Sequence, residues 1–385
     1  MKPLFTICLI ARNESKTLPH MVDSLWEYLS RWWEVLLLDT GSTDNTMEVA
    51  KSLGCTVYDV GTKFLIGINK DTAKKINDKF VVGAEDELVK SGDTLFDFAS
   101  ARNYIAQYSK TAMIATPDCD EVYTKLDIDA INERIERDAE QLEYNFVYSH
   151  DENGNPWIQF THSKFYNKEK MKRKGIIHEV LHSEEDINKV YLWEDIIKLE
   201  HFQNVETNRE KYLTGLAYDC YMDDSNDRNS HYLARELMYK GRYQSAIREF
   251  IRHIGMDKRH TEKSQSMIYI GDCLRYIGRA NEALGWYTRA LDIEPNRREP
   301  LIALAKHYMD NENFNLAKVY ALWALEIWQT SYYSNVAENY KELPHEILYW
   351  AYRWLWDKIK SKEHYDIAVG YNPLKEKYIQ DSKFY

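Results

Sequence analysis

The chain has 385 residues and a formal net charge of −11, and its five cysteines are scattered without a Cys-x-x-Cys pair. This length exceeds one ordinary hydrophobic core, so two domains are expected, while the acidic balance disfavours a general nucleic-acid-binding protein. The odd, scattered cysteines disfavour a disulfide framework or a zinc site. No window approaches roughly 18 uncharged apolar residues and no cleavage signal follows the first apolar run, so we expect a soluble, cytoplasmic protein without a membrane span.

Before about residue 215, short apolar runs alternate with helical stretches, which is typical of a βαβ sheet. Strands are expected at 6–11, 34–39, 54–60, 111–115, 144–149, 157–165 and 195–201. Helices are expected at about 15–29, after the turn at 40–46, and at 96–109. The polar, lysine-rich stretch from 64 to 93 predicts an inserted surface loop.

Two carboxylates, Asp118 and Asp120, follow the expected strand at 111–115. If this strand belongs to a parallel sheet, both leave its carboxyl end, where open α/β sheets place their ligands. Mg²⁺ and Mn²⁺ prefer such oxygen ligands together with substrate phosphates. An isolated Asp-x-Asp is also common in solvated turns and helix caps, so the surrounding motifs decide between the two interpretations.

After residue 215 the strands give way to helices with a recurring period. Ala246, Ala283 and Ala317 each follow a short turn and lie 37 and 34 residues apart. A period of about 34 with small residues at helix contacts is typical of tetratricopeptide helix pairs, and a poorer copy is expected from Glu346 to Gly370. Because one pair cannot bury its apolar face, three or more pairs must stack. A generic helical bundle is the alternative.

Four motifs then stand in order, at 6–14, 38–46, 98–103 and 118–121. Together they resemble the nucleotide-sugar-binding half of a family 2 glycosyltransferase of the GT-A fold. The likeness extends to the subgroup with tetratricopeptide repeats behind the catalytic domain. The resemblance implies an α/β catalytic domain with a Rossmann-like, mostly parallel sheet at residues 1–215. An all-α tetratricopeptide-like repeat domain is implied at 216–385.

The resemblance also assigns roles to individual side chains of the donor site. Asp39 is expected to hold the nucleoside, or otherwise to cap the next helix. Arg102 is expected to contact the nucleotide or its phosphates, with a surface salt bridge as the alternative. Asp118 is expected to face the sugar or ribose and also to be a metal ligand. Asp120 is expected to bind the metal most directly, and His201 to be a third ligand or structural. The other residues expected to hold the nucleoside are Ala11, Arg12, Asn13 and Glu14.

An inverting transferase also needs a general base for its acceptor. The segment 175–182 resembles the Gly-x-(Val/Ile)-His-Glu segment of the subgroup, which makes Glu179 the first candidate and Asp195 the second. The basic cluster before it either attracts an acidic acceptor or forms a solvated face. Its members are Lys170, Lys172, Arg173 and Lys174.

The sequence therefore predicts an inverting glycosyltransferase that uses Mn²⁺ or Mg²⁺ and a nucleotide sugar, with UDP-sugar favoured. The acceptor is a glycan, a protein or another molecule. The repeats are expected to present the acceptor, and to bind a protein partner or a second copy of the chain. Two alternatives stay open: a scaffold whose sheet domain is inactive, and a transferase acting on modified DNA, against which the acidic charge weighs.

Overall fold

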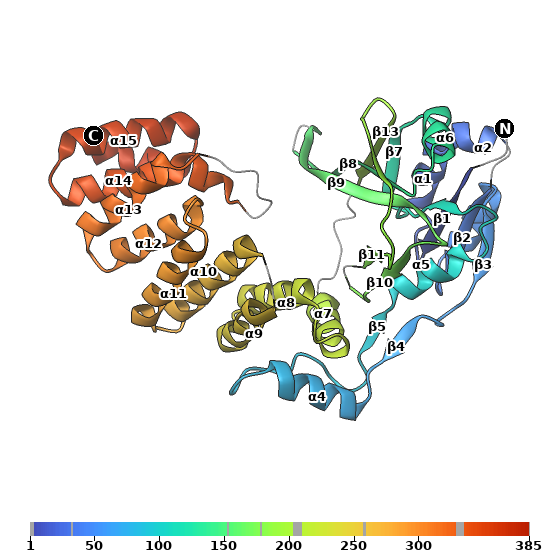
Figure 1. Ribbon diagram of the computed structural model, residues 1–385, viewed down its shortest axis with the longest axis horizontal. Coiled ribbons are helices and arrows are strands. Elements are labelled where there is room, and N and C mark those ends of the chain that lie inside the picture. The colour runs from blue at the N-terminus through green and yellow to red at the C-terminus, as the bar shows by residue number, and fades with distance from the viewer. Residues whose placement is uncertain are drawn as a thin grey trace. The chain divides into compact units, whose positions relative to one another are not determined.

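The computed structural model describes residues 4–31, 34–151, 154–177, 179–202, 210–256, 259–328 and 335–384. The chain divides into two compact units (Figure 1). The first comprises Met1–Thr72 and Lys90–Gly215, and the second Ala73–Val89 and Leu216–Tyr385. Within the described ranges, no helix is both long and apolar enough to cross a membrane.

A nine-stranded sheet forms the first unit, in the order β3-β2-β1-β6-β9-β8-β13-β7, with β12 beside β8. Strands β3, β2, β1 and β6 run parallel to one another, β9 pairs antiparallel to both β6 and β8, and β7 pairs antiparallel to β13. This confirms the predicted α/β unit with a mostly parallel sheet. The strands are β1 (Phe5–Ala11), β2 (Val35–Asp39), β3 (Thr56–Asp59), β6 (Met113–Ala115), β7 (Glu121–Leu126), β8 (Gln141–His150), β9 (Pro156–Asn167), β12 (Lys189–Leu192) and β13 (Ile197–His201).

The sheet has a hydrophobic core on each face because its inner strands are apolar throughout. In β1, Ile7 and Leu9 belong to one core, and Cys8 and Ile10 belong to the other, as the two-residue period of a strand requires. The first core also takes side chains from α1 (Leu18–Ser24), α2 (Trp26–Ser30), α3 (Thr46–Ser52) and α6 (Ile128–Glu136). The second takes side chains from α5 (Phe98–Ala106). Because both faces of the inner strands are buried, side chains that bind a ligand are expected at the ends of these strands.

The stretch 64–93 is not the surface loop that its lysines predicted. It contains β4 (Leu65–Gly67) and α4 (Lys70–Phe80), and β5 (Thr94–Phe96), which follows it directly, pairs with β4. Ala73, Ile76 and Phe80 form a buried stripe on α4, and the lysines lie on its other faces. In the second unit, the amide of Val82 donates to Ser245 Oγ over 2.9 Å. The apolar stripe thus makes α4 part of the helical unit.

Two predicted elements of the first unit differ in their bounds. The helix expected at 15–29 is two helices, α1 and α2, joined at Leu25. The strand expected from 195 begins only at Ile197, because residues 193–196 form a turn in which the amides of Ile196 and Ile197 donate to the Trp193 carbonyl. A separate two-stranded sheet is formed by β10 (Lys172–Lys174) and β11 (Val180–His182).

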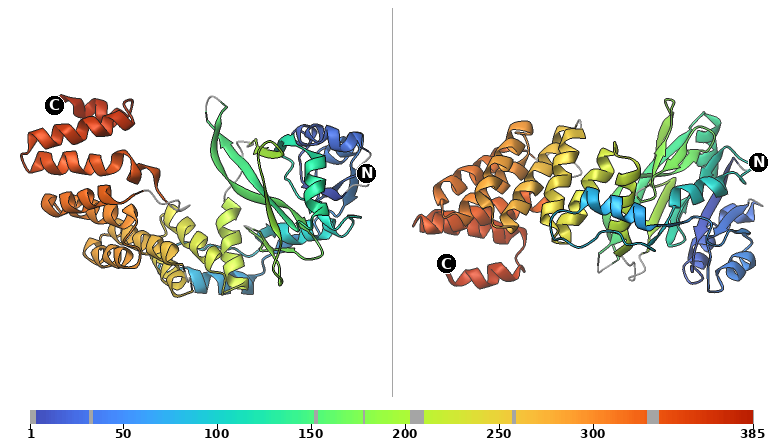
Figure 2. Two further views of the ribbon diagram at one scale, coloured as in Figure 1. Left: turned by 45° about the horizontal axis from the view of Figure 1, so that its top comes forward. Right: turned by 90° about the horizontal axis from the view of Figure 1, so that it is seen from below.

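Helix pairs build the second unit, as the recurring alanines predicted (Figure 2). Ala246, Ala283, Ala317 and Ala368 are all completely buried. The turn inside each pair holds one residue with a positive φ: Gly241, Gly278, Glu312 and Trp356. The four pairs confirm the all-helical repeat region. They are α8 (Asp227–Tyr239) with α9 (Tyr243–Met256), α10 (His260–Tyr276) with α11 (Ala280–Ile293), α12 (Arg298–Asp310) with α13 (Phe314–Glu326), and α14 (Glu342–Trp354) with α15 (Lys358–Tyr371). The remaining helices are α7 (Glu210–Met222), η1 (Ala337–Tyr340), α16 (Glu376–Asp381) and η2 (Ser382–Phe384).

The closest helix contact inside the second pair depends on a missing side chain. A Cβ placed on Gly271 of α10 would overlap the ring of Tyr287, a buried residue of α11 whose hydroxyl donates to Asp272 over 2.8 Å. We expect Gly271→Ala to lower the free energy of unfolding of the helical unit by about 1–3 kcal/mol, because overpacking displaces the ring. Urea denaturation measures this free energy. Gly285→Ala on α11 is the control, because its Cβ meets nothing within 4 Å, and we expect it to raise the free energy of unfolding by about 1 kcal/mol or less. Equal effects of the two substitutions would contradict the prediction.

Candidate functional site

Asp39 ends β2 with its carboxylate buried at the edge of the sheet. Its Oδ1 accepts the amides of Gly41 at 3.0 Å and Ser42 at 2.9 Å, whereas Oδ2 is buried without a partner among the described residues. Ala11 pairs with Asp39 in the sheet, and its carbonyl accepts the amide of Thr40 at 2.9 Å. Asp39 therefore holds the following turn with one oxygen and has the other available to a ligand.

The loop after β1 is tied to the loop after β2. Asn13 adopts φ 60, its Oδ1 accepts the amide of Thr43 at 2.7 Å, and its own amide donates to Ser42 Oγ over 3.0 Å. The amide of Glu14 donates to Thr46 Oγ1 over 2.8 Å. These bonds fix the backbone of the predicted nucleoside-binding segment, while the side chain of Arg12 is exposed.

Glu14 also lies within the electrostatic reach of the paired aspartates. Burial raises the pKa of Glu14, the hydroxyl of Thr17 opposes that shift, and Asp120 and Asp118 raise it further. Glu14 thus belongs to the same acidic region as the Asp118–Glu121 motif, although 104 residues separate Glu14 from Asp118 in the chain. A cation placed among these carboxylates would relieve their repulsion.

Asp118 lies in a network of largely buried charges. Its Oδ1 accepts a hydrogen bond from Arg102 of α5, and its Oδ2 accepts one from Lys164 of β9 at 2.7 Å. Lys164 also donates to the buried carboxylate of Glu121. Burial alone would raise the pKa of Asp118, but Arg102 and Lys164 hold it well below its ordinary value. In this structure, both oxygens of Asp118 are thus engaged by cations.

Glu179 belongs to the same network. Its Oε1 accepts Arg102 Nε at 2.5 Å, and its Oε2 is buried without a partner among the described residues. Arg173 NH1 lies 3.8 Å from the same Oε1, and its NH2 donates to Thr116 Oγ1 over 2.9 Å. Arg173 is therefore buried rather than part of a solvated basic face, whereas Lys170, Lys172 and Lys174 are exposed. His178, in the same predicted segment, lies outside the described residues.

Asp120 and His201 face each other across the pairing of β7 and β13. His201 Nε2 lies 3.0 Å from Asp120 Oδ2, and its Nδ1 lies 3.2 Å from the carbonyl oxygen of Tyr148. The bond to Asp120 raises the pKa of His201, although burial opposes the shift. No group of three or more His, Cys, Asp or Glu side chains with metal-binding geometry is found within the described ranges. The structure thus brings together two of the predicted ligands.

Asp195, the second candidate for the base, is not brought to this site. It is exposed in the turn that precedes β13, while His201 is the last residue of that strand. At about 3.3 Å per residue, the four steps from Ile197 to His201 span roughly 13 Å. Asp195 thus lies beyond the opposite end of β13 from His201, and its role as a base stays a prediction.

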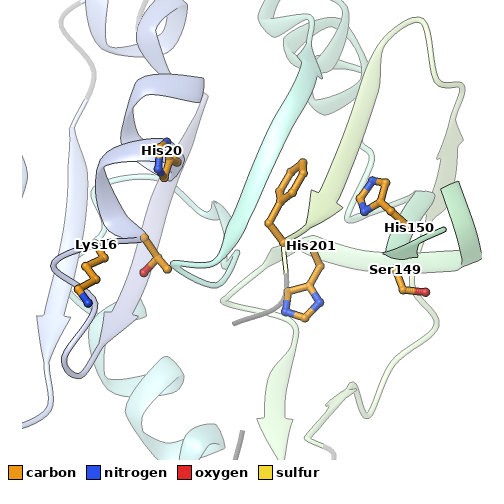
Figure 3. A pocket seen from close by; sticks show the side chains of 7 residues that line it. Lys16, His20, Ser149, His150 and His201 are labelled. Atoms are coloured by element: carbon orange, nitrogen blue, oxygen red, sulfur yellow. The ribbon is translucent and has the colours of Figure 1, made fainter. Parts of the chain in front are cut away.

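A cavity of about 510 Å³ opens beside the Asp120–His201 pair (Figure 3). Lys16 and His20 lie on one side of it, and Ser149, His150 and His201 lie on the other. Thr17 and Phe202 complete its lining. A second, more apolar cavity of about 610 Å³ shares Thr17, His20 and Phe202 with the first and is also lined by Asp120. Space for a substrate therefore adjoins the predicted metal ligands.

Sequence reasoning missed several side chains of this region. Glu121 stood inside a quoted motif, but nothing in the sequence marked its bond to Lys164, 43 residues away. Nothing in the sequence marked Lys164 as a site residue, since it lies within an expected strand. His150 and Glu200, which hydrogen-bond each other, come from strands 50 residues apart. The one sequence signal for Lys164, His150 and Glu200 is a charged or titratable residue within or directly after an expected strand that ends at the site.

Comparisons with known proteins concern each unit separately. Residues 6–73 match the family model described as Glycosyl transferase family 2. No curated protein matches the chain. Among solved structures, the chain is similar to three helical proteins: YrrB, described as a TPR protein with an unusual peptide-binding site (14% identity, 45% of this chain and 83% of that chain, TM-score 0.35), PilF of Pseudomonas aeruginosa (13%, 45% and 72%, 0.36) and MamA of Desulfovibrio magneticus RS-1 (15%, 43% and 87%, 0.35).

The matched segment 6–73 covers most of β1 and all of β2 and β3, and it includes Ala11, Glu14 and Asp39. A family 2 segment supports glycosyl transfer as the general function and implies a nucleotide-sugar donor. The repeat architecture rests on the helix pairs of the chain itself. The N-terminal unit thus carries a glycosyl transferase family 2 segment, which confirms the family resemblance predicted from its motifs.

Proposed function

We propose that the protein is a metal-dependent inverting glycosyltransferase that moves a sugar from a UDP-sugar to an acceptor glycan, protein or other molecule. The observation that supports this most is the buried, unpartnered Oδ2 of Asp39 at the carboxyl end of β2, inside the segment of family 2 type. A buried carboxylate oxygen without a partner is costly, and hydroxyl or N–H groups of a nucleoside would satisfy it.

The donor set at Asp120 and His201 fits Mn²⁺ or Mg²⁺. A carboxylate and an imidazole already lie 3.0 Å apart, and such ions complete their shell with phosphate oxygens and water. When bound, the ion would neutralise the charge of the diphosphate leaving group. Asp118 is the poorer ligand because Arg102 and Lys164 occupy its oxygens, so we assign it to the sugar or ribose.

Asp39→Asn tests the nucleoside role. The asparagine oxygen still accepts the turn amides, but the negative charge is lost and an amide NH₂ replaces Oδ2. We expect the affinity for UDP, measured by calorimetry with Mn²⁺ present, to fall roughly 10- to 100-fold, because a hydrogen bond to a charged group contributes about 1.5–3 kcal/mol.

The matched control is Asp127→Asn. Asp127 also accepts a backbone amide, from Ala130 at 3.0 Å, but it follows β7 at the end far from Asp120. Its replacement should leave UDP affinity unchanged. Equal affinity in the native protein and in Asp39→Asn would contradict the assignment of Asp39. Absence of UDP binding by the native protein would favour the scaffold alternative.

A further inference from the structure

His150 and Glu200 form a histidine–carboxylate pair at the edge of the cavity. His150 ends β8, Glu200 precedes His201 on β13, and 2.7 Å separates His150 Nε2 from Glu200 Oε2. The other oxygen of Glu200 accepts Thr124 Oγ1 at 2.8 Å and lies 3.0 Å from Lys198 Nζ. Contacts with His150, Thr124 and Lys198 therefore hold the Glu200 carboxylate in place, and the carboxylate in turn holds Nε2 of the imidazole.

These contacts set the tautomer and the orientation of the ring. A carboxylate only accepts, so Nε2 of His150 carries the proton that bonds Glu200, and the neutral ring has its lone pair on Nδ1. The ring of Phe202 stacks on the imidazole with centroids 5.2 Å apart at 17°. Glu200 is the only hydrogen-bond partner of this ring among the described residues. The ring is thus held in place while its Nδ1 has no hydrogen-bond partner among the described residues.

His150 lines the same cavity of about 510 Å³ as His201, whose Nε2 contacts Asp120 (Figure 3). A basic nitrogen and one of the proposed metal ligands, His201, therefore border one space, in which an acceptor group fits. The earlier candidate, Glu179, is held at 2.5 Å by Arg102 and is absent from the lining of this cavity. Its position in the lining of the cavity therefore favours His150 over Glu179.

We propose that His150 is the general base that deprotonates the acceptor and that Glu200 is its positioning residue; this rests on the proposed glycosyltransferase function. The acceptor hydroxyl or thiol gives its proton to Nδ1 of His150. Its oxygen or sulfur forms the bond to C1 of the sugar, and the bond from C1 to the diphosphate oxygen breaks, with its electron pair leaving on the diphosphate. Glu200 then stabilises the imidazolium, as the carboxylate does in hydrolase triads.

The charged and titratable groups around His150 come from two elements. On β13 these are Glu200, Lys198 behind it, and His201. Across the cavity they are Lys16 and His20, from the segment that contains α1. Glu200 is the only one of these groups that contacts the imidazole of His150.

His150→Gln is the test, because the glutamine amide can still donate to Glu200 but has no basic nitrogen. The probe reaction is hydrolysis of a panel of UDP-sugars with Mn²⁺, in which water is the acceptor and released UDP is measured. We expect UDP release to fall by 10²- to 10⁴-fold while calorimetric UDP affinity stays within twofold. His20→Gln, in the same cavity, is the control and should change UDP release only a few-fold.

Glu200→Gln separates a positioning role from a structural one. It should reduce UDP release less than His150→Gln does, through the turnover rate and not through UDP affinity. Glu200→Asp should restore part of the lost rate, because a carboxylate can again accept the proton of His150 Nε2. Unchanged UDP release in His150→Gln, or a parallel loss of UDP affinity, would overturn the proposal. A native protein that does not bind UDP would instead overturn the proposed function, so the two failures are distinguishable.

Discussion

Asp120→Asn is expected to reduce Mn²⁺-dependent release of UDP from a UDP-sugar by two or more powers of ten. The asparagine keeps the shape of the side chain and can still bond His201, but it removes the negative charge from the proposed metal site. Metal stabilisation of a leaving group contributes several kcal/mol, and each 1.4 kcal/mol is about tenfold in rate. Direct Mn²⁺ binding, followed by calorimetry without donor, should weaken in parallel.

The matched control for this substitution is Asp23→Asn. Asp23 lines the second cavity together with Asp120 but lies on the exposed side of α1. Removing its charge should change neither Mn²⁺ binding nor UDP release. His201→Gln should weaken Mn²⁺ binding as Asp120→Asn does, because it removes the other proposed ligand. Native rates and native Mn²⁺ affinity in Asp120→Asn would remove the metal role from this pair.

Asp39, Asp120 and His201 were predicted to share one site because each ends a strand or lies in the loop after one. Asp39 ends β2, His201 ends β13, and Asp120 lies in the loop after β6. Parallel strands place their carboxyl ends at one edge of the sheet. This prediction needed only the positions of the strands in the sequence, and not the connections between them or their order in the sheet. This is why motifs separated by more than 100 residues could be placed together.

Pairings across strands could not be predicted in the same way. The bonds from Lys164 to Glu121 and from His150 to Glu200 depend on the order β9-β8-β13-β7 and on its register shifts. One residue of slip would turn each side chain to the opposite face. The stretch 64–93 was misjudged for another reason: the buried residues of α4 alternate with exposed lysines, so the segment as a whole looks polar.

Arg102→Met is expected to lower the free energy of unfolding of the first unit by about 3 kcal/mol. Arg102 is 5% exposed and bonds both Asp118 and Glu179, so its loss leaves buried carboxylates uncompensated, which typically costs about 3–5 kcal/mol. We expect the lower end of this energy range because the side chain of Asp118 is 40% exposed and water screens its charge. Urea denaturation at pH 7 measures the difference.

The pH dependence of that deficit tests its electrostatic origin. Because Arg102 and Lys164 depress the folded-state pKa of Asp118, the stability they contribute is present above the ordinary pKa of 3.8 and is lost as pH falls through the depressed value. The deficit of Arg102→Met should therefore shrink in acid. Arg31→Met, which removes an exposed bidentate pair with Asp129, should change stability little at any pH.

Arg102→Lys distinguishes charge from geometry in the same network. Lysine restores a positive charge but cannot donate along two directions to Asp118 and Glu179 at once, so we expect partial recovery of stability. If Arg102 instead contacts the nucleotide, as the sequence predicted, Arg102→Met should lose UDP affinity and Arg102→Lys should regain part of it. A stability deficit at native UDP affinity would assign Arg102 to holding the site together through its bonds to Asp118 and Glu179.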